Sequence, residues 1–258
     1  MIVLFTIFRT LYIYLNGEKM NLFICFLSGI ATSLGYFFCY LKIEKNKLIA
    51  STLAFASSIM FFMSLLELIP EGIAIIKAHY MIPTSILMIS LFFTIGILIA
   101  LSINNIIKNN EDNLYKVGIY TAIGLIIHNI LEGFITYLTL KIDTEIGLKM
   151  ALSITLHNIP EGISIAIPLF YSINGRKKLF KSLLLLSSSE VLGAILAFTI
   201  FKNVELKIVG ELYLIIAGIM SFIAIFELLK ESLHYKLNKL AIMSFIIGFF
   251  LVLILKFL

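Results

Sequence analysis

The sequence predicts an all-α polytopic membrane protein in which residues 20–258 form a single domain of eight transmembrane helices. Three observations support this fold class. Hydrophobic residues make up 60% of the 258 residues, and the mean hydropathy is +1.06. Charged residues make up only 14%, which is too little for the surface of a soluble protein of this length. Apolar runs of about 20 residues, enough for one bilayer crossing, recur along the chain with short connections between them.

The lipid bilayer is therefore the environment that the composition predicts. The net charge of +5 does not indicate nucleic-acid binding, because most basic residues lie in the connections, where lysine normally flanks a membrane span. Twelve of the 20 Lys and Arg residues fall on one side of the predicted bundle, with the densest group at Arg176–Lys181. This bias places the connections after spans 1, 3, 5 and 7 in the cytoplasm. Both termini are then extracytoplasmic in a multi-pass protein of the plasma membrane.

The N-terminal segment, residues 1–19, is apolar over its first 15 residues apart from Arg9 and Thr10. It lacks a clear small-residue cleavage site, so an uncleaved signal-like anchor, a leader and an extra short helix all remain open. We expect an additional helix against the membrane. Eight full spans follow, each with about 20 apolar residues or more. They cover residues 20–41, 48–76, 80–107, 116–140, 146–173, 179–201, 208–233 and 238–257.

Two nearly identical motifs stand inside the fourth and fifth spans. They are His128-Asn129-Ile130-Leu131-Glu132-Gly133 and His157-Asn158-Ile159-Pro160-Glu161-Gly162. On a helix, residues i and i+4 lie about 40° apart around the axis, so each motif stacks His and Glu on one face with Asn on its flank. A charged side chain near the bilayer centre costs about 2.5–3.5 kcal/mol, and the spans supply almost no basic partners at that depth. The duplicated motif therefore indicates a divalent-cation site within the membrane.

The ligands that these motifs offer are two imidazoles and two carboxylates, supplemented by amides and one further carboxylate. The full set is His128, Glu132, His157 and Glu161, with Asn129, Asn158 and Glu190. It is large enough for two adjacent ions that share bridging carboxylates. The alternative for any single member is a hydrogen-bonded polar residue that ties helices together, but two copies of the motif favour metal.

Prolines and glycines accompany the motifs. Pro160 and Pro70 leave the carbonyls of Leu156 and Leu66 without a helical donor, which either opens space for an ion or serves helix packing alone. The glycine that follows each motif glutamate would let neighbouring backbones approach closely.

Related acidic pairs in two other spans predict an inverted repeat. Glu67 and Glu71 stand four residues apart in the second span, as do Glu227 and Glu231 in the seventh. Spans 2, 4, 5 and 7 are placed symmetrically about the middle of an eight-helix chain. Spans 4 and 5 cross the membrane in opposite directions, and so do spans 2 and 7. In inverted-repeat transporters the substrate site lies near the midplane between the halves. For these four glutamates the sequence predicts only helix contacts or gating.

At these motifs the chain resembles the Zrt-/Irt-like (ZIP) family of metal transporters, in its prokaryotic ZupT-like branch. The resemblance rests on His128–Gly133, His157–Gly162 and Ser187–Ala194, as the motifs of helices 4, 5 and 6. It implies zinc as the main substrate, often with iron, manganese, cobalt or cadmium, moving into the cytoplasm. It also implies that helices 1, 4, 5 and 6 slide against helices 2, 3, 7 and 8, commonly within a homodimer.

The resemblance also implies roles for the ligand residues. His128, Glu132, His157 and Glu161 would form the principal transport site. Asn129, Asn158 and Glu190 would complete a second metal site, with Glu132 and Glu161 bridging the two.

The leading functional hypothesis is a transporter that imports divalent transition metals, without a prosthetic group. An intramembrane metal-dependent enzyme is one alternative, since His and Glu at i and i+4 can hold a catalytic metal, although the zinc-protease signature His-Glu-x-x-His is missing from the sequence. A proton or cation antiporter that uses the buried carboxylates is another. The preferred metal, proton coupling and the oligomeric state are left open by the sequence.

Overall fold

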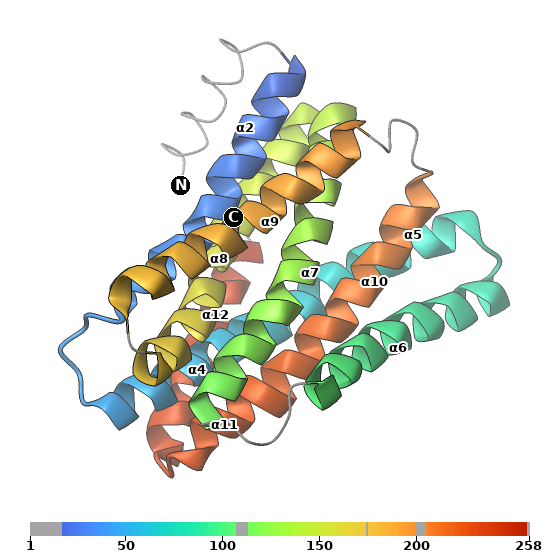
Figure 1. Cartoon of the computed structure of the whole chain (residues 1–258). Coiled ribbons are helices and arrows are strands. Elements are labelled where there is room, and N and C mark those ends of the chain that lie inside the picture. The colour runs from blue at the N-terminus through green and yellow to red at the C-terminus, as the bar shows by residue number, and fades with distance from the viewer. Residues whose placement is uncertain (1–16, 107–112, 174, 200–204, 257–258) are drawn as a thin grey trace.

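The computed structural model describes residues 17–106, 113–173, 175–199 and 205–256, and the regular elements in these ranges are helices (Figure 1). In chain order, the eight long segments within these ranges are α2 Gly17–Ile30 with η1 Ala31–Leu34 and α3 Gly35–Phe38; α4 Lys45–Met63 with η2 Ser64–Leu68 and α5 Ile69–His79; α6 Ile82–Ile106; α7 Asn113–Ile142; α8 Thr144–Ser172; α9 Arg176–Thr199; α10 Leu206–Phe222 with η3 Ile223–Leu229 and α11 Lys230–His234; and α12 Asn238–Lys256. Each predicted span has its counterpart. Of the N-terminal segment 1–19 for which an additional helix is predicted, residues 1–16 lie outside the described residues and residues 17–19 belong to α2.

Seven of these segments are long and apolar enough to cross a membrane. The remaining one, α8, has 29 residues, or about 43 Å at 1.5 Å per residue, so its length also suffices. It is less apolar because it carries His157, Asn158 and Glu161, and these three side chains are buried in protein. The predicted all-α polytopic membrane fold is confirmed.

The helices divide into two bundles, which can be followed in Figure 1. In the first, α7 packs against both α8 and α9, and the α2–α3 segment packs against α8 and α9. In the second, α4 packs against α12 and η3, and α10 packs against α6 and α5. The bundles meet mainly where α4 lies along α8 and α10 lies along α7. This division matches the two helix groups that the family resemblance implies.

Glycines set the closest helix crossings within the first bundle. A Cβ atom on Gly133 of α7 would lie 1.8 Å from the carbonyl oxygen of Glu190 on α9, and one on Gly193 of α9 would lie 1.8 Å from a carbonyl oxygen of α7. A Cβ atom on Gly162 of α8 would likewise lie 1.8 Å from the carbonyl oxygen of Thr32 in η1. The glycine that ends each motif therefore draws a neighbouring backbone against the ligand-bearing helix, as the sequence predicts.

The second and seventh segments share an irregularity at matching places. The π segment η2 holds Glu67, and the π segment η3 holds Glu227. Helix pairing matches as well, since α12 packs on α4 as α6 packs on α10. The repeat predicted from the acidic pairs thus has a structural counterpart, and it places π segments, which are frequent at functional sites, in both halves.

The carbonyl that Pro70 frees has a specific partner. The Leu66 carbonyl oxygen accepts a hydrogen bond of 3.0 Å from Nζ of Lys256, at the end of α12. The carbonyl that Pro70 frees is therefore used in helix packing and not in opening space for an ion.

Candidate metal centre

Helices α7, α8 and α9 bring all seven predicted ligand residues into the interior of the first bundle. His128, Asn129 and Glu132 lie on α7, His157, Asn158 and Glu161 on α8, and Glu190 on α9. Each exposes 5% or less of its surface. Three carboxyl groups and two imidazoles are thus withdrawn from water together, and this requires compensation within the site.

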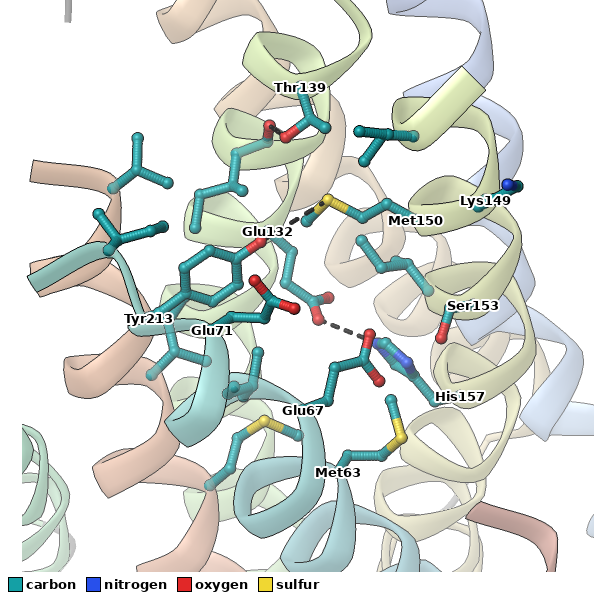
Figure 2. Close-up of a pocket in the computed structure, with 18 residues that line it drawn as sticks. Met63, Glu67, Glu71, Glu132, Thr139, Lys149, Met150, Ser153, His157 and Tyr213 are labelled. Atoms are coloured by element: carbon teal, nitrogen blue, oxygen red, sulfur yellow. Dashed lines mark hydrogen bonds and ion pairs between the residues drawn. The ribbon is translucent and has the colours of Figure 1, made fainter. Parts of the chain in front are cut away.

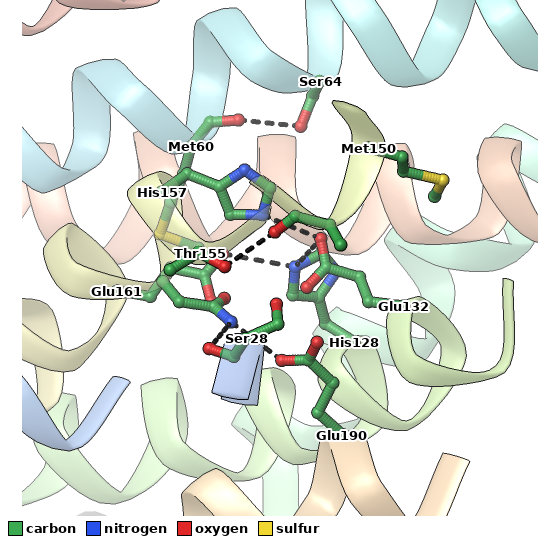
Figure 3. Close-up of polar contacts among 12 residues, drawn as sticks. Ser28, Met60, Ser64, His128, Glu132, Met150, Thr155, His157, Glu161 and Glu190 are labelled. Atoms are coloured by element: carbon green, nitrogen blue, oxygen red, sulfur yellow. Dashed lines mark hydrogen bonds and ion pairs between the residues drawn. The ribbon is translucent and has the colours of Figure 1, made fainter. Parts of the chain in front are cut away.

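One carboxylate lies at the centre of a cluster of four of these residues. Glu132 Oε1 lies 2.9 Å from His157 Nε2, at hydrogen-bonding distance, and 3.1 Å from His128 Nε2. His128 Nε2 also lies 3.2 Å from Glu161 Oε1. Figure 3 shows these side chains pointing toward one another from α7 and α8. The two motifs therefore meet face to face through their histidines and glutamates.

The spacing of these atoms suits one divalent ion. Zinc binds imidazole nitrogen at about 2.0–2.1 Å and carboxylate oxygen at about 2.0–2.2 Å, which puts neighbouring ligand atoms of a tetrahedral site about 3.3 Å apart. Ligand atoms of His128, Glu132 and His157 all lie within 4.8 Å of one another. If these side chains moved slightly apart from their present separations, their ligand atoms would be spaced to surround an ion.

A second group lies beside this cluster. The side-chain amide of Asn158 donates hydrogen bonds to Glu190 Oε2 at 2.8 Å and to the Ser28 carbonyl oxygen at 3.1 Å. These bonds join α8 to α9 and α2, and Figure 3 shows Glu190 next to Ser28. Asn129 is fully buried one residue after His128. The structure thus pairs two of the three residues predicted for a second metal site.

Several buried atoms in this region have no hydrogen-bond partner among the described residues. They are Oε2 of Glu161, Oε2 of Glu132, Oε1 of Glu190, Oδ1 of Asn158 and both amide atoms of Asn129. Buried polar atoms in proteins are normally paired. Most of these atoms are oxygens that accept hydrogen bonds, so a cation is the partner that their chemistry suits.

A cavity of about 370 Å³ reaches this cluster from between the two bundles. Glu132 and His157 line it, together with Glu67 and Glu71 of the α4–α5 segment. Figure 2 shows Glu67 beside His157 and Glu71 on the same side of the cavity. Glu71 is exposed, Glu67 is half-buried and Glu132 is buried, so carboxylates follow one another from solvent to the cluster.

Thioether and phenol groups complete the wall of this cavity. Met63 and Met150 line it, and the hydroxyl of Tyr213 lies 3.8 Å from the Met150 sulfur (Figure 2). Lys149, also in the wall, forms an ion pair of 3.0 Å with Glu145. The cavity therefore combines acidic groups with polarisable sulfur, a combination that transition-metal ions favour over alkali ions.

The sequence alone did not place Glu67 and Glu71 in the site. Its only signal was their position in the predicted repeat, and the packing of α4 along α8 brings them to the cavity. Glu231 is buried and Glu227 is partly buried elsewhere in the second bundle, and their predicted contact or gating role stays a prediction. The remaining two histidines, at positions 79 and 234, are exposed at helix ends.

Comparisons with known proteins identify the family. The family described as ZIP Zinc transporter matches residues 108–256, more than half of the chain. A zinc transporter ZupT of Streptococcus mutans is 32% identical over 240 residues, which cover 86% of this chain and 90% of that protein. The chain belongs to the ZIP family. Zinc transporter ZupT of Clostridium perfringens is 29% identical over 91% of this chain and 94% of its own, and Protein zntB of Dictyostelium discoideum is 28% identical over 91% and 81%.

Membership of the ZIP family confirms the resemblance seen in the motifs, including its ZupT-like branch. The protein is a membrane transporter of divalent metal ions rather than an enzyme. The matched residues 108–256 include α7, α8 and α9 entirely, so all seven predicted ligands lie within the part of the chain that the family shares.

Proposed function

We propose that this ZIP protein imports zinc into the cytoplasm, and that it also accepts iron, manganese, cobalt or cadmium in the divalent state. The relatives named as zinc transporters support zinc. The ligand chemistry supports the wider range, because imidazole and carboxylate groups bind several first-row metals and discriminate weakly among them. The observation that carries the proposal is the buried cluster in which Glu132 lies within 3.1 Å of both His128 and His157.

His128, Glu132, His157 and Glu161 would hold the principal ion. Asn129, Asn158 and Glu190 would complete a second site, with Glu132 and Glu161 bridging. The unpaired oxygens of Glu161, Glu132 and Glu190 support this assignment, because each bridging carboxylate keeps a second oxygen available. Since the ion must leave again, oxygen-rich coordination without thiolate suits transport better than tight structural binding.

Entry would follow the carboxylates that line the cavity. A hydrated ion would meet Glu71 first and Glu67 next, and would then exchange waters for the imidazoles and carboxylates of the cluster. The cavity wall includes residues near the end of α5 and the start of α8, the end of the bundle that the lysine distribution places outside. Both termini are then extracytoplasmic, in a protein of the plasma membrane.

Release would require the first bundle to move against the second. The contact between α4 and α8 and the contact between α10 and α7 form the surface along which they would slide. Within the second bundle, hydroxyl groups tie helices together: Ser58 Oγ donates to the Phe245 carbonyl at 2.6 Å, and Ser232 Oγ donates to the Ala50 carbonyl at 2.6 Å. These bonds favour a rigid second bundle that serves as the fixed partner. Association as a homodimer stays a prediction of the family resemblance.

Zinc uptake into proteoliposomes loaded with a fluorescent chelator tests the proposal. Wild type would be compared with His157→Ala and Glu161→Ala, and with His234→Ala and Glu205→Ala as controls at exposed positions. We expect saturable influx that both site variants lose and both controls keep, with cadmium a good competitor and calcium a poor one. Tight zinc binding by wild type without influx would overturn the proposal.

A further inference from the structure

An apolar groove opens on the first bundle, away from the metal centre. It lies between the first half of α7, the end of α8 and the start of α9, and its volume is about 620 Å³. Its wall is formed chiefly by Ile119, Ala122 and Ile126 of α7, Ile165 and Leu169 of α8, and Leu186 of α9. The wall of the groove is therefore mainly hydrocarbon, and the groove lies within the part of the protein that lipid surrounds.

The groove ends in a basic mouth. Lys178, Ser182 and Leu185 line both the groove and a neighbouring shallow cavity, whose other lining residues are Lys177 and Lys181. All three lysines are exposed, and none of them forms an ion pair with a carboxylate of the described residues. Three adjacent positive charges directly beside the apolar groove thus have no counter-charge from the part of the chain that the structure describes.

Aromatic side chains mark this end of the bundle as a membrane–water boundary. Phe37, which is 62% exposed, lines a further shallow cavity with Lys177 and Lys181. The Arg176 guanidinium lies 5.4 Å from the centre of the Tyr40 ring. Tyrosines next to basic side chains are typical of the headgroup level of a membrane. The lysines of the mouth therefore lie at the depth of lipid phosphates.

We propose that this groove binds a phospholipid with an anionic headgroup, its acyl chain along the α7–α8–α9 wall and its headgroup against Lys177, Lys178 and Lys181. The apolar wall of the groove matches the acyl chain of such a lipid, and the three lysines at its end match the anionic headgroup. Each lysine near a membrane surface attracts anionic lipid, and three together select it over a zwitterionic one. A second copy of this chain is a poorer occupant, because docking face to face would bring two lysine clusters together.

Lipid retention measured by native mass spectrometry tests this proposal. The full chain would be equilibrated with equal amounts of phosphatidylglycerol and phosphatidylcholine and released from its bilayer disc. One variant replaces the mouth lysines, Lys177→Gln with Lys178→Gln and Lys181→Gln. Its matched control removes three exposed lysines from α11, α12 and the turn between them, Lys230→Gln with Lys236→Gln and Lys239→Gln. A third variant, Ala122→Phe, fills the groove without changing charge.

Wild type should retain phosphatidylglycerol preferentially. The ratio of retained phosphatidylglycerol to retained phosphatidylcholine should fall about fivefold for each mouth lysine removed. In the matched control this ratio should stay near the wild-type value. Ala122→Phe should lower retention of phosphatidylglycerol while the preference for its headgroup persists. Each variant would first be shown to fold by its unfolding temperature.

Three results would overturn the proposal. The first is equal retention of the two lipids by wild type. The second is an equal loss of preference in the matched control, which would mean a general effect of charge. The third is full competition by soluble glycerol phosphate, which would assign the lysines to free phosphate instead of a lipid.

Discussion

Glu132 of α7 and His157 of α8 join the two motif helices through a contact of 2.9 Å between Oε1 and Nε2. The same oxygen lies 3.1 Å from Nε2 of His128, so one carboxylate oxygen of α7 is shared by imidazoles from both helices. The four-residue spacing in each motif explains how His and Glu reach one face. The packing of α7 against α8 explains why the two faces meet. Glu132 therefore contacts the histidines of both copies of the duplicated motif.

Replacing Glu132 with Gln should weaken metal binding more than any change at the edge of the site. The amide keeps the size of the side chain but removes the negative charge that faces both imidazoles. We expect zinc affinity, measured by calorimetry on the purified protein, to fall by at least about tenfold, the lower end of what outer-shell partners of metal ligands cost. Glu145→Gln, an exposed change near the start of α8, should bind zinc like wild type. Unchanged affinity in Glu132→Gln would remove this residue from the ligand set.

Glu67 and Glu71 should speed the arrival of metal without setting the maximal rate. Because both carboxylates line the cavity above the cluster, Glu67→Gln with Glu71→Gln should raise the KM for uptake a few-fold and leave the saturated rate nearly unchanged. The difference from wild type should shrink with added salt, since the Debye length falls from about 10 Å at 0.1 M to about 3 Å at 1 M. Glu205→Gln removes an exposed charge outside this cavity and should not change the KM. A complete loss of uptake in the double variant would instead make these residues obligatory ligands.

Gly133 should tolerate no side chain. A methyl group there would meet the Glu190 carbonyl oxygen, which belongs to the α9 backbone and cannot rotate away, so α7 and α9 must separate. Overpacking of this kind typically costs about 1–3 kcal/mol, and we expect Gly133→Ala to lower the unfolding temperature clearly. Gly124→Ala on the same helix is the control, because the one close contact of its new methyl would be with the end of the flexible Ile223 side chain. Equal stability of the two variants would show that the close crossing is not required.

The spans and the shared face of His and Glu in each motif could be predicted from the sequence because both depend on local patterns. Apolar length fixes a membrane helix, and spacing along one helix fixes which residues share a face. The place of Glu67 in the cavity beside Glu132 and His157 could not be predicted, because it depends on how α4 packs along α8. The hydrogen bond from Lys256 to Leu66 was equally hidden, since 190 residues separate the two in the chain. Pro70 predicts that the Leu66 carbonyl is free, but no nearby residue indicates which group binds it.

Uptake should fall as the external pH is lowered, because protons and metal compete for the same atoms. An imidazole ordinarily titrates near pH 6.5, and His128 and His157 must be unprotonated at Nε2 to bind an ion. Lowering the pH from about 7.5 to about 5.5 should therefore raise the KM for zinc, while a large excess of zinc restores most of the saturated rate. The measurement is zinc influx into proteoliposomes at several external pH values with the internal pH held constant. Influx independent of pH at low zinc would contradict coordination by these imidazoles. A fall that excess zinc does not reverse would place the proton-sensitive step in bundle movement rather than in binding.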